Sequence, residues 1–162
     1  MTVRSVLLFI FFMNTASLFA QKPAATIPAF TFFKEDQSPF TKENLTKGTK
    51  SFFIFFDPGC DHCQRTVAQL DKRGKELLKP SIYFVTLDKP QGAKNFMQRY
   101  GKNLSQQKNV TMLYDVRYQF IPKFQPLKYP SMFLYNKQGK LLKYSDEEKE
   151  VGRLVELASK NE

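Results

Sequence analysis

The chain has 162 residues, of which 42% are hydrophobic and 25% charged, and it contains 17 Phe, 7 Tyr, no Trp and two Cys. This is enough chain for one domain with a sizeable core, and its apolar content, with 7 Gly and 9 Pro, excludes a disordered, collagen-like or low-complexity protein. The formal net charge of +10 fits nucleic acid, an anionic membrane surface or acidic partners, and it equally fits a well-solvated surface.

The first twenty residues have the pattern of a secretory signal peptide. Arg4 precedes an unbroken apolar run over 6–13, and small and polar residues follow up to Ala20. The eight residues of this run are too few to span a bilayer, which needs about 20. We therefore expect 1–20 to be removed after Ala20, although Leu18 is large for its position before the cut. The alternative is an uncleaved anchor or a buried helix.

Export reduces the number of partners that the positive net charge could serve to bind. An exported chain rarely meets nucleic acid, so we expect no nucleic-acid partner. The lysines are scattered along the chain, which favours a solvated surface, with association to an anionic membrane surface as the alternative. No cysteine follows the apolar run to take a lipid, and no retention signal is found. The predicted location is the bacterial periplasm or the extracellular space.

The rest of the chain alternates between strand and helix patterns. A Pro/Ala-rich leader over 21–29 precedes a single expected domain at 30–162. The domain begins with a brief strand at 30–33 and a short helical turn that Thr41 caps and Gly48 ends.

Two strands are expected at the centre of the sheet. The near-continuous apolar run at 51–56 predicts a strand buried on both faces, and the β-branched and aromatic segment at 82–88 predicts its neighbour. Between them we expect a helix over 60–79 that Pro80 closes. The next patterns predict a helix, a strand and one or two helical turns, at 91–104, 110–114 and 116–124.

The C-terminal part predicts a hairpin and a helix. Strands at 132–135 and 141–144 are joined by a turn over 136–139. Ser145 and Glu148 have capping-box spacing, and they precede an apolar helical stripe made of Val151, Leu154, Val155 and Ala158. Because parallel strands need right-handed helical crossovers, this order predicts an α/β sandwich with helices on both faces of the sheet.

The two cysteines of the chain, Cys60 and Cys63, have C-x-x-C spacing at the start of the predicted helix. Cys63 begins an apolar stripe that faces the sheet and continues through Val67, Leu70, Gly74 and Leu77. Cys60 falls in the first turn, where backbone N–H groups and the helix dipole stabilise a thiolate. This asymmetry suits disulfide exchange, in which Cys60 attacks a substrate disulfide and Cys63 resolves the mixed disulfide.

The two residues between the cysteines have opposite expected effects on the Cys60 thiolate. As an imidazolium or a hydrogen-bond donor, His62 would stabilise the Cys60 thiolate and make the pair more oxidising. Asp61 opposes this, because a carboxylate beside a thiol raises the pKa of the thiol. The sequence therefore leaves the reduction potential open, and the alternative for His62 is a solvated loop residue.

Other uses of the cysteines fit less well. A structural zinc site needs four ligands, and the chain has two Cys and one His. Haem attachment needs His directly after the second Cys, where Gln64 stands. A structural disulfide is the main alternative, but one that closes so short a loop would stabilise the chain little.

The turn at 57–59 and the Cys60-Asp61-His62-Cys63 motif that follows it resemble the active site of thioredoxin-fold proteins. The segment 128–140 is similar to the cis-proline strand and hairpin of that family. The resemblance extends from about Phe30 to Ala158 and is closest to exported TlpA-like and redoxin-type members. It implies a thioredoxin-like three-layer α/β/α sandwich with a central mixed sheet and an inserted element between the central strands.

The resemblance also implies roles for Tyr129 and Pro130. Pro130 would be cis and face the cysteine pair, which leaves the preceding backbone free to pair with an extended substrate. Tyr129 would then line the substrate groove. The alternative is an ordinary trans proline at the start of a strand.

Three positions depart from the family pattern. Gly59 replaces the usual Trp before the first cysteine, and Ile54 stands where thioredoxins have a buried Asp. The proton acceptor for Cys63 is therefore unidentified, with Asp57 as a candidate whose alternative is a helix cap. Peroxiredoxins have Thr where this chain has Asp57, which disfavours a peroxidase.

These observations together predict an exported thiol:disulfide oxidoreductase. We expect a monomer that exchanges disulfides with protein substrates and an unidentified redox partner, with no cofactor and no metal. The resemblance favours reduction and His62 favours oxidation, so the direction stays open. The alternatives are a thioredoxin-fold adaptor whose thiols bind Cu(I) and, less well supported, a peroxidase.

Overall fold

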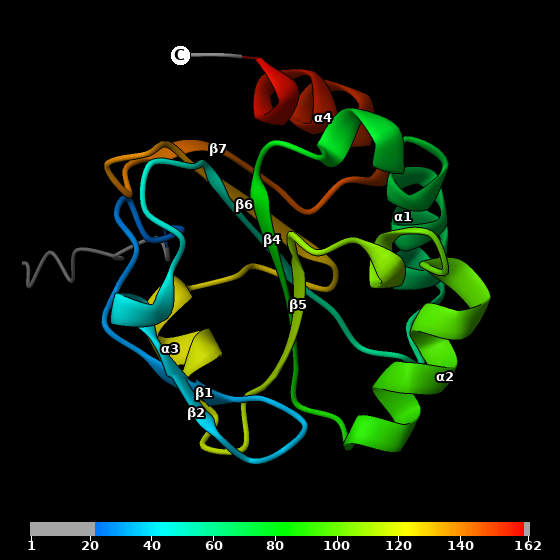
Figure 1. The fold of residues 1–162 in the computed structure, drawn as a ribbon, viewed down its shortest axis with the longest axis horizontal. Coiled ribbons are helices and arrows are strands. Elements are labelled where there is room, and N and C mark those ends of the chain that lie inside the picture. Colours follow the sequence, from blue (N-terminus) through cyan, green and yellow to red (C-terminus); the bar gives the residue numbers. More distant parts are fainter. Residues whose placement is uncertain (1–21, 161–162) are drawn as a thin grey trace, which may run out of the picture.

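The computed structural model describes residues 22–160, so the predicted signal peptide lies outside the described residues (Figure 1). Within this range the strands are β1 (Thr31–Phe33), β2 (Pro39–Thr41), β3 (Ser51–Phe55), β4 (Ser81–Thr86), β5 (Val110–Tyr114), β6 (Ser131–Tyr135) and β7 (Leu141–Ser145). The α-helices are α1 (Asp61–Lys72), α2 (Pro90–Tyr100), α3 (Phe120–Phe124) and α4 (Val151–Ser159). Short 3-10 helices are η1 (Lys42–Asn44), η2 (Gly74–Leu77), η3 (Leu104–Gln106) and η4 (Glu148–Glu150).

All seven strands of the described residues form one mixed sheet in the order β2-β1-β5-β4-β3-β6-β7. β3, β4 and β5 are parallel, whereas β6 runs antiparallel to β3 and β7 antiparallel to β6. The predicted central strands therefore pair with each other. The strands on either side of β3, which are β4 and β6, are joined in the chain through α2, β5 and α3.

The sheet separates two apolar layers, as the α/β sandwich prediction requires. Helices α1, α2 and α4 lie on one side of the sheet and α3 on the other (Figure 1). Because side chains alternate along a strand, Phe52 and Ile54 of β3 pack in the layer of α1, α2 and α4, while Phe53 and Phe55 pack in the layer of α3. The α3 layer is rich in aromatic rings, among them the stacked pair Phe120–Phe124, whose centroids are 4.2 Å apart. None of the helices within residues 22–160 is long and apolar enough to cross a membrane.

The helix predicted over 60–79 ends earlier, at Lys72, and continues as the separate turn η2. Gly74 is buried there, and a Cβ on it would lie 2.9 Å from Nε2 of Gln107, which donates a hydrogen bond to the Gly74 carbonyl. A tertiary contact with the segment around η3 therefore ends α1. In the same way, the helix predicted over 91–104 is α2 followed by η3.

The predicted capping box of the last helix is wrong. Ser145 belongs to β7, and its hydroxyl accepts a hydrogen bond from the backbone N–H of Glu147. Glu148 instead binds Arg65 and Gln69 of α1. The helical stripe itself is confirmed, because the four residues predicted for it are buried: Val151, Leu154, Val155 and Ala158.

Residues 22–29, the described part of the expected leader, pack along the domain. The carbonyl of Ala25 accepts a hydrogen bond from the backbone N–H of Leu141 at 2.8 Å, and that of Ala24 accepts one from the Tyr135 hydroxyl at 3.0 Å. Ile27 is buried in the aromatic layer. The strand β2, for which the sequence offered no pattern, pairs with β1 beside this layer.

Candidate active site

The cysteine motif lies where β3 ends and α1 begins. Asp57 forms the turn between them: its Oδ1 accepts a hydrogen bond from the Gly59 N–H at 2.7 Å, and its carbonyl accepts one from the Cys60 N–H at 3.1 Å. Asp57 therefore stabilises the turn before the helix, and it is not the helix cap given as the alternative, because the N-cap of α1 is Cys60. This turn places Cys60 at the N-cap of α1.

The two thiols have different environments. The Cys60 sulfur is half-buried and accepts a hydrogen bond from the Cys63 N–H at 3.4 Å, as an N-cap side chain does. Cys63 is fully buried within the layer formed by α1, α2 and α4. Burial, with a contribution from Cys60, raises the pKa of the Cys63 thiol well above its usual range. Only Cys60 is thus both accessible and oriented by a helix N-terminus.

The Tyr129–Pro130 peptide bond is cis, as the resemblance implied. The Tyr129 ring stacks on Phe55 with centroids 4.7 Å apart. Burial raises the pKa of Tyr129 to about 12, and the charges of Asp57 and both cysteines contribute. Tyr129 also packs against the buried cluster that contains Cys63. The loop is anchored by Ser131, whose hydroxyl donates to the Lys128 carbonyl at 2.6 Å and bonds the Tyr144 hydroxyl at 2.9 Å.

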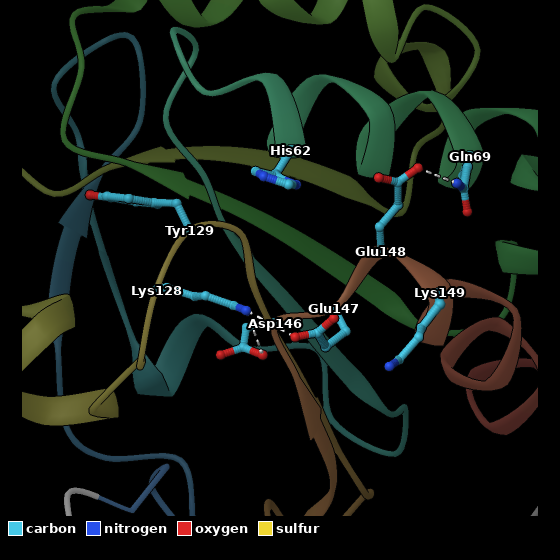
Figure 2. A pocket seen from close by; sticks show the side chains of 8 residues that line it. All are labelled: His62, Gln69, Lys128, Tyr129, Asp146, Glu147, Glu148 and Lys149. Atoms are coloured by element: carbon cyan, nitrogen blue, oxygen red, sulfur yellow. Dashed lines mark hydrogen bonds and ion pairs between the residues drawn. The ribbon is translucent and has the colours of Figure 1, made fainter.

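A groove of about 460 Å³ lies beside the first turn of α1, between this helix, the loop at 128–129 and the segment joining β7 to α4. Figure 2 shows His62 and Gln69 projecting from α1 toward Lys128 and the acidic segment. The lining residues are His62, Gln69, Lys128, Tyr129, Asp146, Glu147, Glu148 and Lys149.

Most of the charges in the groove are paired. Lys128 Nζ lies 2.9 Å from Glu147 Oε1 and 3.8 Å from Asp146 Oδ1. The hydrogen bond that Lys128 donates to Glu147, together with the negative charges of Asp146 and Glu147, raises the pKa of Lys128, and Lys128 lowers the pKa of Glu147. Arg65 pairs with Glu148 at 2.9 Å. The groove is therefore polar without a large excess of one charge.

The residues between the cysteines are both exposed. His62 Nδ1 lies 2.8 Å from Nη2 of Arg65, so the ring is oriented by that side chain. Ser131, the first residue of β6, pairs with Phe55 at the end of β3. The loop with Tyr129 and Pro130 and the turn with Cys60 and Cys63 therefore lie at the same end of the sheet, and His62 lies on the wall of the adjoining groove. Asp61 is the first residue of α1 and takes no part in the groove lining.

Sequence reasoning missed the other residues that line the groove, and it missed Arg65, which contacts two of the lining residues, His62 and Glu148. Arg65, Gln69 and Lys128 carry no motif, and the acidic residues at 146–148 were interpreted as the start of a helix. One sequence signal could have predicted the contact between His62 and Arg65: their i to i+3 spacing places them one turn apart on the same face of a helix.

A protein-family model described as the AhpC/TSA family matches residues 23–144. No curated protein matches the chain. Among solved structures, the chain is similar to a secreted Mycobacterium tuberculosis disulfide oxidoreductase described as homologous to E. coli DsbE, at 17% identity, TM-score 0.63, covering 79% of this chain and 95% of that one. A Bacteroides fragilis thiol-disulfide oxidoreductase matches at 19% identity and TM-score 0.64, covering 82% of this chain and 98% of that one.

The peroxidoxin BcpB from M. tuberculosis is also similar, at 12% identity and TM-score 0.67, covering 86% of this chain and 96% of that one. At these identities the matches show the fold alone, and they confirm the predicted thioredoxin-like architecture. The family model, which matches residues 23–144, also covers most of the chain.

Proposed function

The chain belongs to the AhpC/TSA family, and we propose that within this family it is an exported thiol:disulfide oxidoreductase that uses Cys60 and Cys63. The observation that carries the proposal is the asymmetry of the pair. The Cys60 sulfur accepts the Cys63 N–H at the N-cap of α1, whereas Cys63 is buried with a raised pKa.

In this proposal Cys60 is the nucleophile. Its thiolate attacks one sulfur of a substrate disulfide, the substrate S–S bond breaks, and the departing substrate thiolate takes up a proton. Cys63 then loses its proton and attacks the Cys60 sulfur, which forms the Cys60–Cys63 disulfide and releases the second substrate thiol. Two electrons pass from the protein to the substrate, and the reverse sequence oxidises a substrate dithiol.

The burial of Cys63 supports this order of events. A thiol whose pKa is raised stays protonated and does not compete with Cys60 for the incoming disulfide. Tyr129 lines the groove together with His62 of the C-x-x-C motif, and this supports a place for an extended substrate chain in the groove.

Export is proposed on two grounds. The basic start, short apolar run and small residues before Gln21 have the pattern of a cleaved signal. One similar solved structure is described as secreted, and another, from Chlorobium tepidum, as a thiol:disulfide interchange protein DsbE.

The decisive experiment measures the reduction potential of the pair by equilibration in glutathione and dithiothreitol buffers, alkylation of free thiols and mass analysis. We expect a reversible disulfide that Cys60→Ser and Cys63→Ser each abolish. A value near about −270 mV would identify a reductant, and about −180 to −120 mV an isomerase or oxidant. A pair that forms no reversible disulfide would refute the proposal and favour the Cu(I)-binding adaptor, which copper titration of the reduced protein then tests.

A peroxidase is the second candidate, because a peroxidoxin and a peroxiredoxin-like protein share the fold. The Asp57 carboxylate, occupied by the Gly59 N–H, stands where peroxiredoxins have Thr, which counts against it. Rapid consumption of hydrogen peroxide that Cys60→Ser abolishes would establish this activity, and its absence would exclude it.

A further inference from the structure

His62 is held by a chain of polar contacts that ends in the loop after β7. Nη2 of Arg65 lies 2.8 Å from His62 Nδ1, and Nε of Arg65 donates to Glu148 Oε2 at 2.9 Å. The other carboxylate oxygen of Glu148 accepts a hydrogen bond from Gln69 Nε2 at 2.6 Å. Arg65 is thus fixed at both ends of its guanidinium, between the first turn of α1 and a segment more than eighty residues away.

This arrangement determines which nitrogen of His62 carries a proton. A guanidinium has only donors, so Nδ1 must accept with its lone pair. A neutral imidazole whose Nδ1 accepts carries its hydrogen on Nε2. An imidazolium would direct an N–H and a positive charge at Arg65. For a neutral ring, the contact therefore selects the tautomer whose single N–H donor is Nε2.

The donor belongs to a side chain that lines the groove. His62 projects from α1 into the space opposite Lys128 (Figure 2). The carboxylates across the groove are engaged with Lys128 or with Arg65 and Gln69. The groove thus offers the His62 donor to an occupant. An extended polypeptide presents backbone carbonyl oxygens, which accept such a bond.

We propose that Arg65 is a positioning residue that holds His62 as the Nε2–H tautomer, so that His62 donates a hydrogen bond to a backbone carbonyl of a polypeptide substrate in the groove. This inference rests on the proposed disulfide exchange and names the substrate class: an extended polypeptide disulfide in preference to a small one. It differs from the sequence expectation that His62, as an imidazolium or a hydrogen-bond donor, stabilises the Cys60 thiolate.

The kinetic test uses the Cys63→Ser background, in which attack by Cys60 stops at the mixed disulfide and is counted by mass spectrometry. Rates are measured for a disulfide joining two extended peptides and for hydroxyethyl disulfide, which is too short to fill the groove. We expect Arg65→Met to lower the ratio of the peptide rate constant to the small-disulfide rate constant about 3- to 10-fold, the effect of one hydrogen bond. His62→Ala should lower it equally, and the double variant no further.

Arg73→Met is the matched control, because Arg73 follows α1, pairs with Glu76 and lies outside the groove lining. It should keep the parent ratio. An Arg65→Met ratio within twofold of the parent, with both disulfides still attacked, would overturn the inference and leave the proposed function standing. Failure of the parent to attack either disulfide would instead refute the proposed function.

A spectroscopic test is independent of activity. The nitrogen shifts of the His62 ring at pH 8 should indicate the Nε2–H tautomer in the parent and an average of both tautomers in Arg65→Met. The Nδ1–H tautomer or a mixture in the parent would contradict the inference, whether or not the protein exchanges disulfides.

Discussion

Only two residues separate two thiols that have different environments. Cys60 ends the turn that Asp57 holds and shares the open N-terminus of α1, whereas Cys63 begins the buried face of the same helix. Helical geometry is the cause, because a residue at the N-cap stays at the end of the helix while one a turn later faces the sheet.

Burial of Cys63 predicts a stability change with pH in the reduced protein. Because its folded pKa is raised, the native state retains a proton that the unfolded chain, with a thiol pKa near about 8.5, releases. The stabilisation is complete below that value and is lost as pH rises. We expect the free energy of unfolding to fall by about 1.4 kcal/mol per pH unit more than in Cys63→Ala between about pH 9 and 10.

Urea denaturation of both reduced proteins at a series of pH values measures this difference. Other titrating groups are common to the two proteins, so their contributions cancel in the comparison. Parallel pH profiles would show that the Cys63 thiol ionises alike in the folded and unfolded chain.

At the scale of elements, the helix α3 begins at a buried carboxylate, that of Asp115, and packs toward a residue that lines the groove. Asp115 accepts the backbone N–H groups of Gln119 at 2.9 Å and Phe120 at 2.6 Å, which begins this five-residue helix. The Phe120 ring stacks on Phe55 at 4.3 Å, and Phe55 in turn stacks on Tyr129. Through these stacked rings, the position of α3 supports Tyr129, which lines the groove.

We expect Asp115→Ala to lower the free energy of unfolding by about 1–3 kcal/mol, because it leaves buried N–H groups without acceptors. Chemical denaturation measures the loss. Asp36→Ala is the control, since Asp36 is exposed and bonds only its neighbour Ser38 among the contacts described for it, and its effect should stay within about 0.5 kcal/mol. Equal effects of the two substitutions would show that the buried cap is not needed.

At the scale of the whole molecule, export would leave a mature chain that begins close to residues which bond to the domain. Cleavage after Ala20 leaves Gln21 first, only a few residues before Ala24 and Ala25 bond to the domain. Mass spectrometry of the protein from a cell that secretes it should find the N-terminus near Gln21. Recovery of protein that begins at Met1 would contradict the proposed signal peptide and the location.

The sequence by itself determined the α/β sandwich, its central strands and the cysteine motif. Each depends on local patterns: the apolar run of β3, the 3.6-residue stripe that begins at Cys63, and the turn residues 57–59. The prediction of a cis bond at Pro130 depended on a resemblance, and the structure agrees with it.

Only the tertiary structure decided where α1 ends and what surrounds its first turn. Gly74 packs against the side chain of Gln107. Arg65 donates a hydrogen bond to Glu148, a residue 83 positions further along the chain. The spacing of Ser145 and Glu148 predicted a capping box. In the fold, the Glu148 carboxylate instead forms an ion pair with Arg65 and accepts a hydrogen bond from Gln69. Local preferences act over a few residues, whereas these contacts exist only after the sheet has brought α1 and the segment after β7 together.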